Sequence, residues 1–319
     1  MKAVVYDRYG PPDVLRVEQV PVPSPSASQV LVEVAATSIN LSDWECLRGT
    51  PFYARLGGLR TPKRRTLGSD IAGRVAAVGD AVTRFGVGDA VYGDNLQLLG
   101  GFAEYTLVPE SALAHKPEEL TFAAAATIPQ AGAIALQGTA GFSAGQRVLI
   151  NGAGGGSGAF AIQLAKRAGV HVTGIDNAGK LEFMRSLGAD EVGDYARQDF
   201  ADFPPFDRIL DLVATRSPFA CRRALAPDGR YRCVGGAVRT LLPIVTIGAL
   251  VGRATGRRVG MLAVTQGPTH FEPLTELCVA DDVRIHIDRT FSLDEVPQAL
   301  TYVGEGRSLG KVVVAIAAG

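Results

Sequence analysis

The stretch between Gln146 and Asp176 constrains the fold of this 319-residue chain more than any other feature. It opens with the apolar run Val148-Leu149-Ile150, which is too short for a helix and is followed by glycines, so we expect a buried strand. A turn almost devoid of side chains follows, then apolar residues at helical spacing, and then a second apolar run that ends at Asp176. Strand, glycine turn, helix, strand and acid is the order found in a dinucleotide-binding βαβ unit.

The ligand of such a unit explains the glycines of the turn. A pyrophosphate lies on backbone N–H groups at a helix N-terminus, and any Cβ in the turn would hold it away. Gly152, Gly155 and Gly158 recur every three residues, so Ser157 or Ala159 stands at the last glycine of the usual GxGxxG pattern. A tight turn with a purely structural role is the alternative. The predicted cofactor contacts in the turn are Gly152, Gly155, Gly156, Ser157 and Gly158.

Composition argues against several other classes of protein. Lys+Arg 32 balances Asp+Glu 32, so nothing in the charge indicates a nucleic acid or an anionic membrane as partner. The four cysteines are scattered without a C-x-x-C pair, which argues against a disulfide framework and fits a reducing cytosol. The N-terminus lacks the apolar core of a signal peptide, and the longest apolar stretch, 241–251, is too short to cross a bilayer. We expect a soluble cytoplasmic protein that binds a small-molecule substrate.

The pattern divides the chain into three parts. Residues 1–120 carry short β-prone runs, for example 14–17 and 71–75, separated by proline and glycine turns, which is typical of an antiparallel barrel. Residues 121–265 alternate strands and helices, which predicts a doubly wound parallel sheet. Residues 266–319 return to the pattern of the first domain. The expected strands of the middle part after Asp176 are 191–192, 207–213, 229–236 and 257–264.

Motifs along nearly the whole chain resemble those of the medium-chain dehydrogenase/reductase superfamily, in its zinc-independent, quinone-oxidoreductase-like branch. The resemblance implies an α/β protein with a GroES-like antiparallel β-barrel domain, an inserted Rossmann domain and a cleft between them. The matching motifs are Ser38-Ile39-Asn40, Gly68-Ser69-Asp70-Ile71-Ala72-Gly73, Val87-Gly88-Asp89, Ile128-Pro129-Gln130-Ala131-Gly132, Val148-Leu149-Ile150-Asn151-Gly152-Ala153, Ser186-Leu187-Gly188-Ala189-Asp190 and Gly310-Lys311-Val312-Val313.

Zinc is not expected. The zinc-dependent alcohol dehydrogenases of the same superfamily carry a cysteine where Asn40 stands and a histidine where Ser69 stands. Zinc prefers thiolate, imidazole or carboxylate ligands, and the carboxylates Asp43 and Asp70 without His or Cys nearby are more typical of a structural pair. Without a Lewis acid, hydride transfer favours acceptors that delocalise negative charge, which are quinones and the β-carbon of enones.

The resemblance also assigns residues to the two ends of the cofactor. It places Asn40 at the nicotinamide end with Thr127 close by, and it adds Gly235 and Lys311 to the cofactor site. Tyr53 and Tyr92 are the phenols that could donate a hydrogen bond or a proton to the substrate, and for each a packing role is the alternative. The four histidines fall in no recognised motif, and no hydrolase motif is present.

The choice between NADPH and NADH depends on the end of the second strand. A carboxylate at Asp176 can bind the adenosine ribose hydroxyls and would repel a 2′-phosphate, which favours NADH. The branch that the chain resembles usually takes NADPH, and Lys180 and Tyr195 could contact its 2′-phosphate, although Lys180 could equally be a solvated lysine at a helix start. We expect NADPH, with NADH possible because of Asp176.

The predicted function is an NAD(P)H-dependent reductase that transfers hydride to a quinone or an activated alkene. Two alternatives remain: an enoyl reductase that tailors an acyl or polyketide intermediate, and a non-catalytic NADPH-binding sensor or structural protein. The basic run 52–65 is either a solvated loop or a lid over an anionic cofactor.

A homodimer is predicted from the apolar run Leu241–Val251 and from the last strand of the parallel sheet, whose edge needs covering. Pairing of two such edges would extend the sheet across both subunits, as is common in the family that the chain resembles. In the alternative, the apolar run is a helix packed against its own domain or a wall of the substrate cleft.

Overall fold

The computed structural model describes residues 1–253 and 256–316. Their contacts group the chain into two compact units, the first formed by Met1–Ala133 with Thr265–Gly319 and the second by Ile134–Val264. The chain passes from the first unit to the second within helix α3 (Pro129–Thr139).

Unit 1 is built on a seven-stranded sheet with the order β14-β15-β3-β4-β5-β7, in which β6 also pairs with β3. All its pairs are antiparallel except β14 with β15, which is parallel. A separate antiparallel pair joins β1 to β2. The strands of unit 1 are β1 (Lys2–Val5), β2 (Arg16–Gln19), β3 (Gln29–Ile39), β4 (Asp70–Val78), β5 (Ala90–Asp94), β6 (Tyr105–Pro109), β7 (Leu113–His115), β14 (Ile287–Ser292) and β15 (Lys311–Ala315).

Short helices pack against this sheet. Helices α1 and α9 pack on each other, and Leu47 of α1 and Leu300 of α9 are fully buried in one core with Val312 of β15. The helices of unit 1 are α1 (Leu41–Arg48), α2 (Phe122–Ala125), α8 (Glu272–Val279), α9 (Val296–Gly304) and the 3₁₀ turns η1 (Pro12–Val14), η2 (Phe52–Arg55), η3 (Glu110–Ala112), η6 (Pro268–His270) and η7 (Leu293–Glu295).

The pattern of β3 explains the second core of unit 1. Val30, Val32 and Val34 alternate along the strand, so they point to one face and are buried there with Val75 and Val91 of the neighbouring strands. One predicted strand differs from the structure. The run 14–17 is divided, because Val14 ends the turn η1 and β2 begins only at Arg16.

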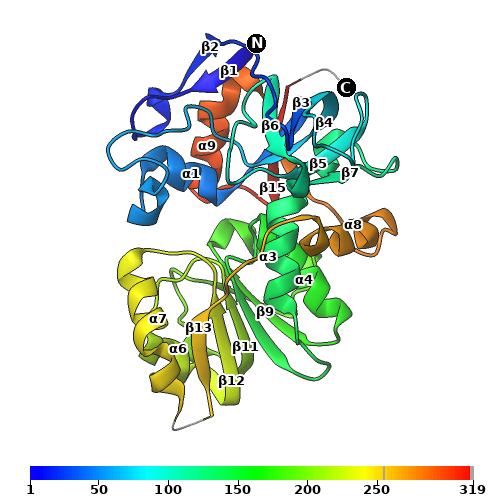
Figure 1. Ribbon diagram of the computed structural model, residues 1–319. Helices are drawn as coiled ribbons and strands as arrows, with labels where there is room; N and C mark the ends of the chain where they lie inside the picture. Colours follow the sequence, from blue (N-terminus) through cyan, green and yellow to red (C-terminus); the bar gives the residue numbers. More distant parts are fainter. Residues whose placement is uncertain (254–255, 317–319) are drawn as a thin grey trace. The chain divides into compact units, whose positions relative to one another are not determined.

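Unit 2 carries a six-stranded sheet with the order β10-β9-β8-β11-β12-β13, and all its pairs are parallel. The predicted doubly wound parallel sheet is therefore confirmed. Figure 1 shows α6 and α7 on one side of the strands and α4 on the other. Its elements are β8 (Arg147–Asn151), α4 (Gly156–Arg167), β9 (His171–Asp176), η4 (Ala178–Lys180), α5 (Leu181–Ser186), β10 (Glu191–Asp194), η5 (Phe200–Asp202), β11 (Phe206–Asp211), α6 (Pro218–Arg223), β12 (Leu225–Cys233), α7 (Val238–Arg253) and β13 (Arg258–Met261).

The apolar run Leu241–Val251 lies within helix α7, so the helix alternative describes it correctly. Ile244 is buried in the core of unit 2, and a Cβ added at Gly248 would lie 2.7 Å from the carbonyl oxygen of Val259, so the helix packs closely on β13. The opposite face of α7 is open, with Leu242 59% and Leu250 62% exposed. Strand β13 is shorter than predicted and is the edge of the sheet.

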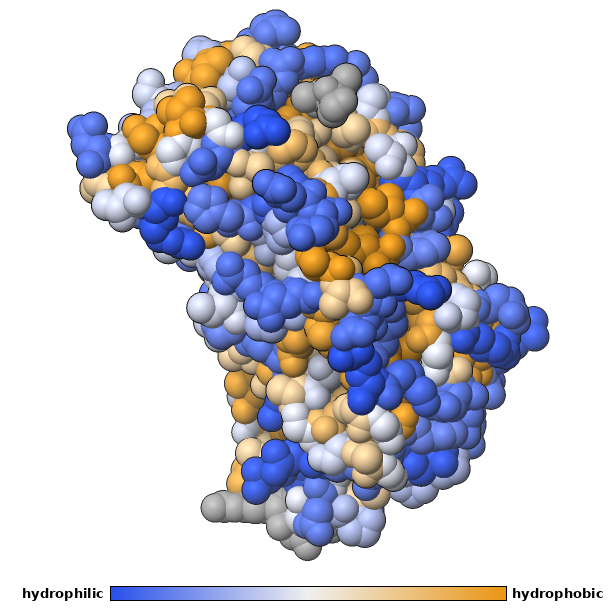
Figure 2. All heavy atoms as spheres, turned by 90° about the vertical axis from the view of Figure 1, so that its right-hand side faces the viewer, coloured by the Kyte–Doolittle hydropathy of each residue, from blue (hydrophilic) through white to orange (hydrophobic). Residues whose placement is uncertain are grey.

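Hydrophobic side chains on the face drawn in Figure 2 occur in small groups separated by hydrophilic ones. Among the described residues, no helix is both long and apolar enough to span a membrane.

Candidate functional site

The glycine turn of unit 2 joins β8 to α4, and its three regularly spaced glycines have different roles. Gly152 adopts a left-handed conformation with φ of 79°, which lets the chain leave the strand sharply. A Cβ at Gly158 would lie 2.4 Å from the carbonyl oxygen of Gly152, so Gly158 permits close packing of the helix on the turn. A Cβ at Gly155, just before α4, would lie 3.5 Å from the carbonyl oxygen of Gly152, which is an ordinary contact distance. The turn is thus open at Gly155 and beside the N-terminus of a 12-residue helix.

Asp176 ends β9 next to this turn, but its carboxylate faces the protein. One oxygen accepts the N–H of Gly154 at 2.9 Å, and the other accepts the N–H of Asn177 at 2.8 Å and lies 3.4 Å from Nζ of Lys180. Asp176 is only 7% exposed. These oxygens brace the glycine turn, and the contact of Asp176 with the adenosine ribose stays a prediction.

Lys180 contacts the carboxylate of Asp176, and Tyr195 contacts its backbone carbonyl. Lys180 is 5% exposed and its aliphatic chain packs on Gly154, so the picture of a solvated lysine at a helix start is wrong. Tyr195 follows β10, donates its N–H to the carbonyl of Asp176 at 3.1 Å and leaves its side chain 59% exposed. Tyr195 thus offers an accessible phenol at the carboxyl edge of the sheet, where ligands of such sheets bind.

Asp211 ends β11 and binds several groups at the carboxyl edge of the parallel sheet. Its carboxylate accepts hydrogen bonds from the side chains of Asn151 and Tyr231, each at 2.7 Å, and from the N–H groups of Val213 and Ala214. Gly235 has a φ of 73° and lies two residues beyond the end of β12, so it belongs to the same edge.

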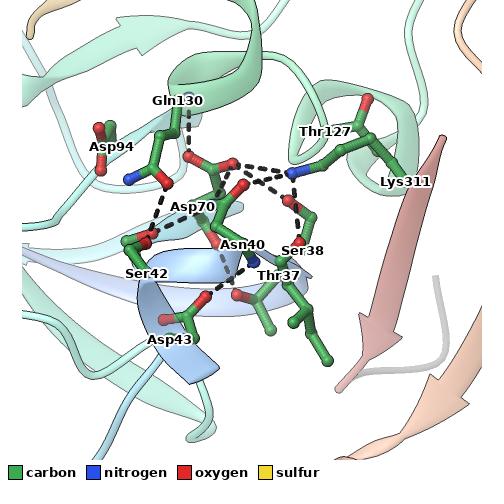
Figure 3. A network of polar contacts seen from close by, with 12 residues as sticks. Thr37, Ser38, Asn40, Ser42, Asp43, Asp70, Asp94, Thr127, Gln130 and Lys311 are labelled. Atoms are coloured by element: carbon green, nitrogen blue, oxygen red, sulfur yellow. Dashed lines mark hydrogen bonds and ion pairs between the residues drawn. The ribbon is translucent and has the colours of Figure 1, made fainter. Parts of the chain in front are cut away.

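In unit 1 a buried network of polar side chains surrounds Asp70 at the start of β4 (Figure 3). Nζ of Lys311 donates to Oδ1 of Asn40 at 2.7 Å and lies 3.4 Å from Oδ2 of Asp70. Nδ2 of the Asn40 side chain donates to the same Asp70 oxygen at 2.9 Å and to Oγ of Ser69 at 3.2 Å. The hydroxyl of Ser38 also donates to Oδ2 of Asp70, at 3.1 Å. Both ends of the Asn40 amide are thereby fixed.

Three buried carboxylates share this region with one buried lysine. Burial, reinforced by the charge of Asp70, raises the pKa of Asp94 to about 8, and burial raises the pKa of Asp43 to about 7. Burial lowers the pKa of Lys311, while Asp70 opposes that effect. Asp43 also accepts the N–H groups of Asn40 and Gly68, which fixes the start of α1. Part of the carboxylate charge in this region is therefore neutralised by protons.

Asp94 and Gln130 extend the network and were not predicted as site residues. Asp94 is the last residue of the buried strand β5 and is in register with Asp70 of β4. Gln130 donates its backbone N–H to Asp70 at 3.0 Å, and its side-chain oxygen accepts a hydrogen bond from the hydroxyl of Ser42 at 2.9 Å. A carboxylate at the end of a buried strand is the sequence signal that could have identified Asp94. Asp94 lines a cavity of about 90 Å³ within unit 1, beside Asn95, whose buried Oδ1 has no hydrogen-bond partner.

The remaining predicted residues of unit 1 differ in accessibility. The phenol of Tyr92 is buried against Oγ1 of Thr275 at 2.8 Å, and burial raises its pKa, so the packing alternative fits Tyr92. Tyr53 is half-buried, and its hydroxyl donates to the carboxylate of Glu45 at 3.2 Å. Burial raises the pKa of Glu45 to about 7. Thr127 is buried and donates its hydroxyl to a backbone carbonyl at 2.7 Å.

Two arginines of the basic run 52–65 bind other residues of unit 1. Arg55 donates to the carbonyl of Gly49 at 2.9 Å, and Arg65 pairs with Asp7 at 2.6 Å. Arg60, Lys63 and Arg64 are exposed, so the interpretation as a lid over a cofactor concerns these three residues.

Comparisons with known proteins agree along the whole chain. Residues 26–118 match the family of alcohol dehydrogenase GroES-like domains, and residues 187–314 match the zinc-binding dehydrogenase family. The chain is 35% identical over 332 residues to the 2-methylene-furan-3-one reductase of Solanum lycopersicum, a match that covers 98% of this chain and 79% of that protein. It is 33% identical over 333 residues to the chloroplastic NADPH-dependent alkenal/one oxidoreductase of Arabidopsis thaliana, with the same coverage.

A solved structure of a quinone oxidoreductase also matches the chain. The quinone oxidoreductase from Coxiella burnetii matches with a TM-score of 0.90 and 31% identity over 99% of both chains. The chain therefore belongs to the medium-chain dehydrogenase/reductase superfamily, among relatives that include its quinone oxidoreductases. The predicted GroES-like domain is confirmed, and the chain is an NAD(P)H-dependent oxidoreductase.

Proposed function

We propose that the chain transfers a hydride from NADPH to a quinone or to the β-carbon of an activated alkene, without zinc. The observation that carries the proposal is the open glycine turn at Gly155, beside the N-terminus of α4. The names of the two plant relatives support the acceptor class, since one reduces a methylene-furanone and the other alkenals or alkenones.

The preference for NADPH is supported by the surroundings of Asp176. A free carboxylate at the end of β9 would repel a 2′-phosphate. The ammonium of Lys180 and the N–H groups of Gly154 and Asn177 compensate the charge of Asp176, so that repulsion is reduced. Tyr195 and Arg197, whose side chain is 84% exposed, follow β10 beside the end of β9 and could contact the phosphate.

The proposal of a zinc-free site is supported by the chemistry of the groups that replace the zinc ligands. Asn40 and Ser69 offer an amide and a hydroxyl, which are poor zinc ligands, and the amide oxygen of Asn40 binds the ammonium of Lys311. Metal analysis of protein purified without chelator should find well under one zinc per chain, and activity should survive chelation. Stoichiometric zinc that is lost together with activity would overturn the zinc-free proposal.

When it is bound, the reduced nicotinamide supplies the hydride, and the chain must hold it and stabilise charge on the acceptor oxygen. Asn40 is rigidly oriented by Lys311 and Asp70, so it can define one wall for the nicotinamide. Tyr53, paired with Glu45, is the phenol that we propose as a hydrogen-bond donor to the acceptor.

The assay for this function measures NADPH and NADH oxidation with a panel of quinones, enones and enoyl thioesters. We expect turnover of quinones or enones, faster with NADPH. Turnover restricted to enoyl thioesters would indicate the acyl-tailoring alternative, and NADPH binding without turnover would indicate a sensor or structural protein.

We also propose that the chain is a cytoplasmic homodimer that pairs through the edge strand β13 and the open face of α7. Because Leu262 donates its N–H to β12, the N–H groups of Val259 and Met261 point to the free edge. Met261→Pro removes one of these free donors within β13 and therefore tests the pairing of two edges. Light scattering should give twice the 33.4 kDa chain mass for the wild type and less for Met261→Pro. A monomeric wild type at micromolar concentration would contradict the dimer.

A further inference from the structure

Three arginines meet at a small cavity on one face of the parallel sheet of unit 2. Arg208 of β11 and Arg230 of β12 are directly paired in register, and Arg232 is two residues further along β12, so all three point to the same face. They line a cavity of about 30 Å³ together with Gly138 in the last turn of α3 and with Ala140, Gly141 and Phe142, which follow that helix.

No carboxylate of the described residues lies within ion-pair distance of these three guanidinium groups. Other arginines of unit 2 are paired, for example Arg147 with Glu191 and Arg185 with Glu182. Arg208 donates to the backbone carbonyl of Asp207. Burial lowers the pKa of Arg208, the like charges of Arg230 and Arg232 add to that effect, and the charge of Asp207 opposes it. The fold thus holds three half-buried like charges together, and none of them forms an ion pair with a carboxylate of the described residues.

The cavity is distinct from the dinucleotide edge of the sheet. Arg208 and Arg230 are in register with Val148, three residues before Asn151 and the glycine turn, and one strand residue spans about 3.3 Å. Arg232 lies two residues nearer to that edge. A Cβ at Gly138 would lie 2.7 Å from the side chain of Leu210, so the end of α3 covers the face on which the arginines lie. Nicotinamide nucleotides bind beyond the carboxyl ends of the strands and not on this face.

We propose that this cluster, Arg208, Arg230 and Arg232, is a binding site for a compact oxyanion with two or more negative charges, of which inorganic phosphate is the simplest. Guanidinium groups bind such oxygens in a bidentate, charge-assisted geometry. The cavity has room for about two water-sized groups, which is enough for two oxygens of a phosphate group and too small for a nucleotide.

The site has two consequences for stability. An anion that binds only the folded chain stabilises it according to its concentration relative to its dissociation constant. Without the anion, mutual repulsion of the three charges destabilises the folded chain, most strongly at low ionic strength. Arg258 of β13, in register with Arg230, adds a fourth positive charge to the same row.

The test follows the melting temperature of the NADP⁺-saturated protein as sodium phosphate replaces sodium chloride at constant ionic strength. Saturation with NADP⁺ keeps phosphate out of the dinucleotide site. We expect a saturable rise in the wild type and an apparent phosphate affinity about tenfold weaker in Arg230→Gln and in Arg232→Gln, equivalent to about 1.4 kcal/mol. Arg223→Gln removes the same charge from an exposed position on α6 and should leave the phosphate response unchanged.

A second readout separates a ligand site from a merely structural cluster. In dilute chloride, Arg230→Gln and Arg232→Gln should melt higher than the wild type because a like charge is removed, and Arg223→Gln should not. The kcat/KM for NADPH should be unchanged in Arg232→Gln, so the outcome is independent of the proposed reaction.

The assignment is wrong if phosphate stabilises the wild type no more than chloride does, or stabilises Arg230→Gln and Arg232→Gln as well as the wild type. It is also wrong if the arginines bind a carboxylate of a second copy of the chain. In that case phosphate would displace the carboxylate and dissociate a dimer.

Discussion

Nζ of Lys311 lies 2.7 Å from Oδ1 of Asn40, so the last strand of the chain supplies a buried cation to the residue that follows β3. The same ammonium lies 3.4 Å from the fully buried Asp70. The resemblance to zinc-dependent alcohol dehydrogenases implies a metal-binding cysteine where Asn40 stands. Here its side-chain oxygen binds an ammonium of the chain itself.

Replacing Lys311 with Met should be strongly destabilising. The substitution leaves Asp70 buried without its cation, which costs about 3–5 kcal/mol. The double variant Lys311→Met/Asp70→Asn should recover part of that loss, because no buried charge is then left unpaired. Lys2→Met, which removes the exposed ion pair with Asp294, should cost at most about 1 kcal/mol. Urea unfolding measures all four proteins, and equal losses in the two lysine variants would contradict the role of Lys311.

Asp94 should make the stability of the protein depend on pH. Its pKa in the folded chain is about 8, above the ordinary 3.8, so the stability that its neutral form contributes is present below about pH 4 and is lost as the pH rises towards 8. Asp94→Asn keeps the shape and cannot ionise. The unfolding free energy of Asp94→Asn should therefore fall less than that of the wild type between pH 5 and pH 8. Parallel pH profiles would show that Asp94 does not titrate in this range.

Gly155→Val should weaken NADPH binding by at least tenfold while the protein still folds. A Cβ at Gly155 meets only one protein atom, at 3.5 Å, but it would occupy the place of the pyrophosphate. Gly158→Ala is the contrasting variant, because its Cβ would lie 2.4 Å from the carbonyl oxygen of Gly152, so it should lower the melting temperature. Calorimetric titration and thermal unfolding separate the two effects, and undiminished NADPH affinity in folded Gly155→Val would remove the nucleotide site from this turn.

Asp176→Ser should weaken binding of NADPH and NADH together. The carboxylate holds the N–H of Gly154 and the ammonium of Lys180, so its loss loosens the turn that both cofactors share. From the sequence alone, the same substitution is expected to improve the ratio of NADPH to NADH by about 1–2 kcal/mol, because it removes a like charge. Dissociation constants for both cofactors decide between the two accounts, and a selective gain for NADPH would show that Asp176 faces the ribose.

The contrast at Asp176 illustrates how far sequence patterns extend. The parallel sheet and the glycine turn follow from local periodicity and from glycine spacing, and the structure has both. The direction in which a carboxylate at the end of a strand points depends on which N–H groups lie near it, and no local pattern encodes that. Sequence reasoning therefore identified the residue but not the N–H groups and the ammonium that its carboxylate contacts.

The network around Asp70 shows the same limit in unit 1. Lys311 and Asn40 are 271 residues apart, and only the antiparallel pairing of β15 with β3 brings them together. Asp94 reaches Asp70 through the pairing of β5 with β4. Family motifs predicted Asn40 and Lys311 as site residues, but their mutual hydrogen bond required the fold.

The reaction that we propose for this chain is zinc-free hydride transfer from NADPH to an activated double bond. The most direct test incubates the chelated protein, verified to hold no zinc, with a simple enone and with NADPH deuterated at C4 in the pro-R or, separately, in the pro-S position. Mass and NMR analysis should find deuterium on the β-carbon of the product with one of the two cofactors and not with the other. Product formation that requires added zinc, or a reduced product without deuterium at that carbon with either cofactor, would contradict this reaction.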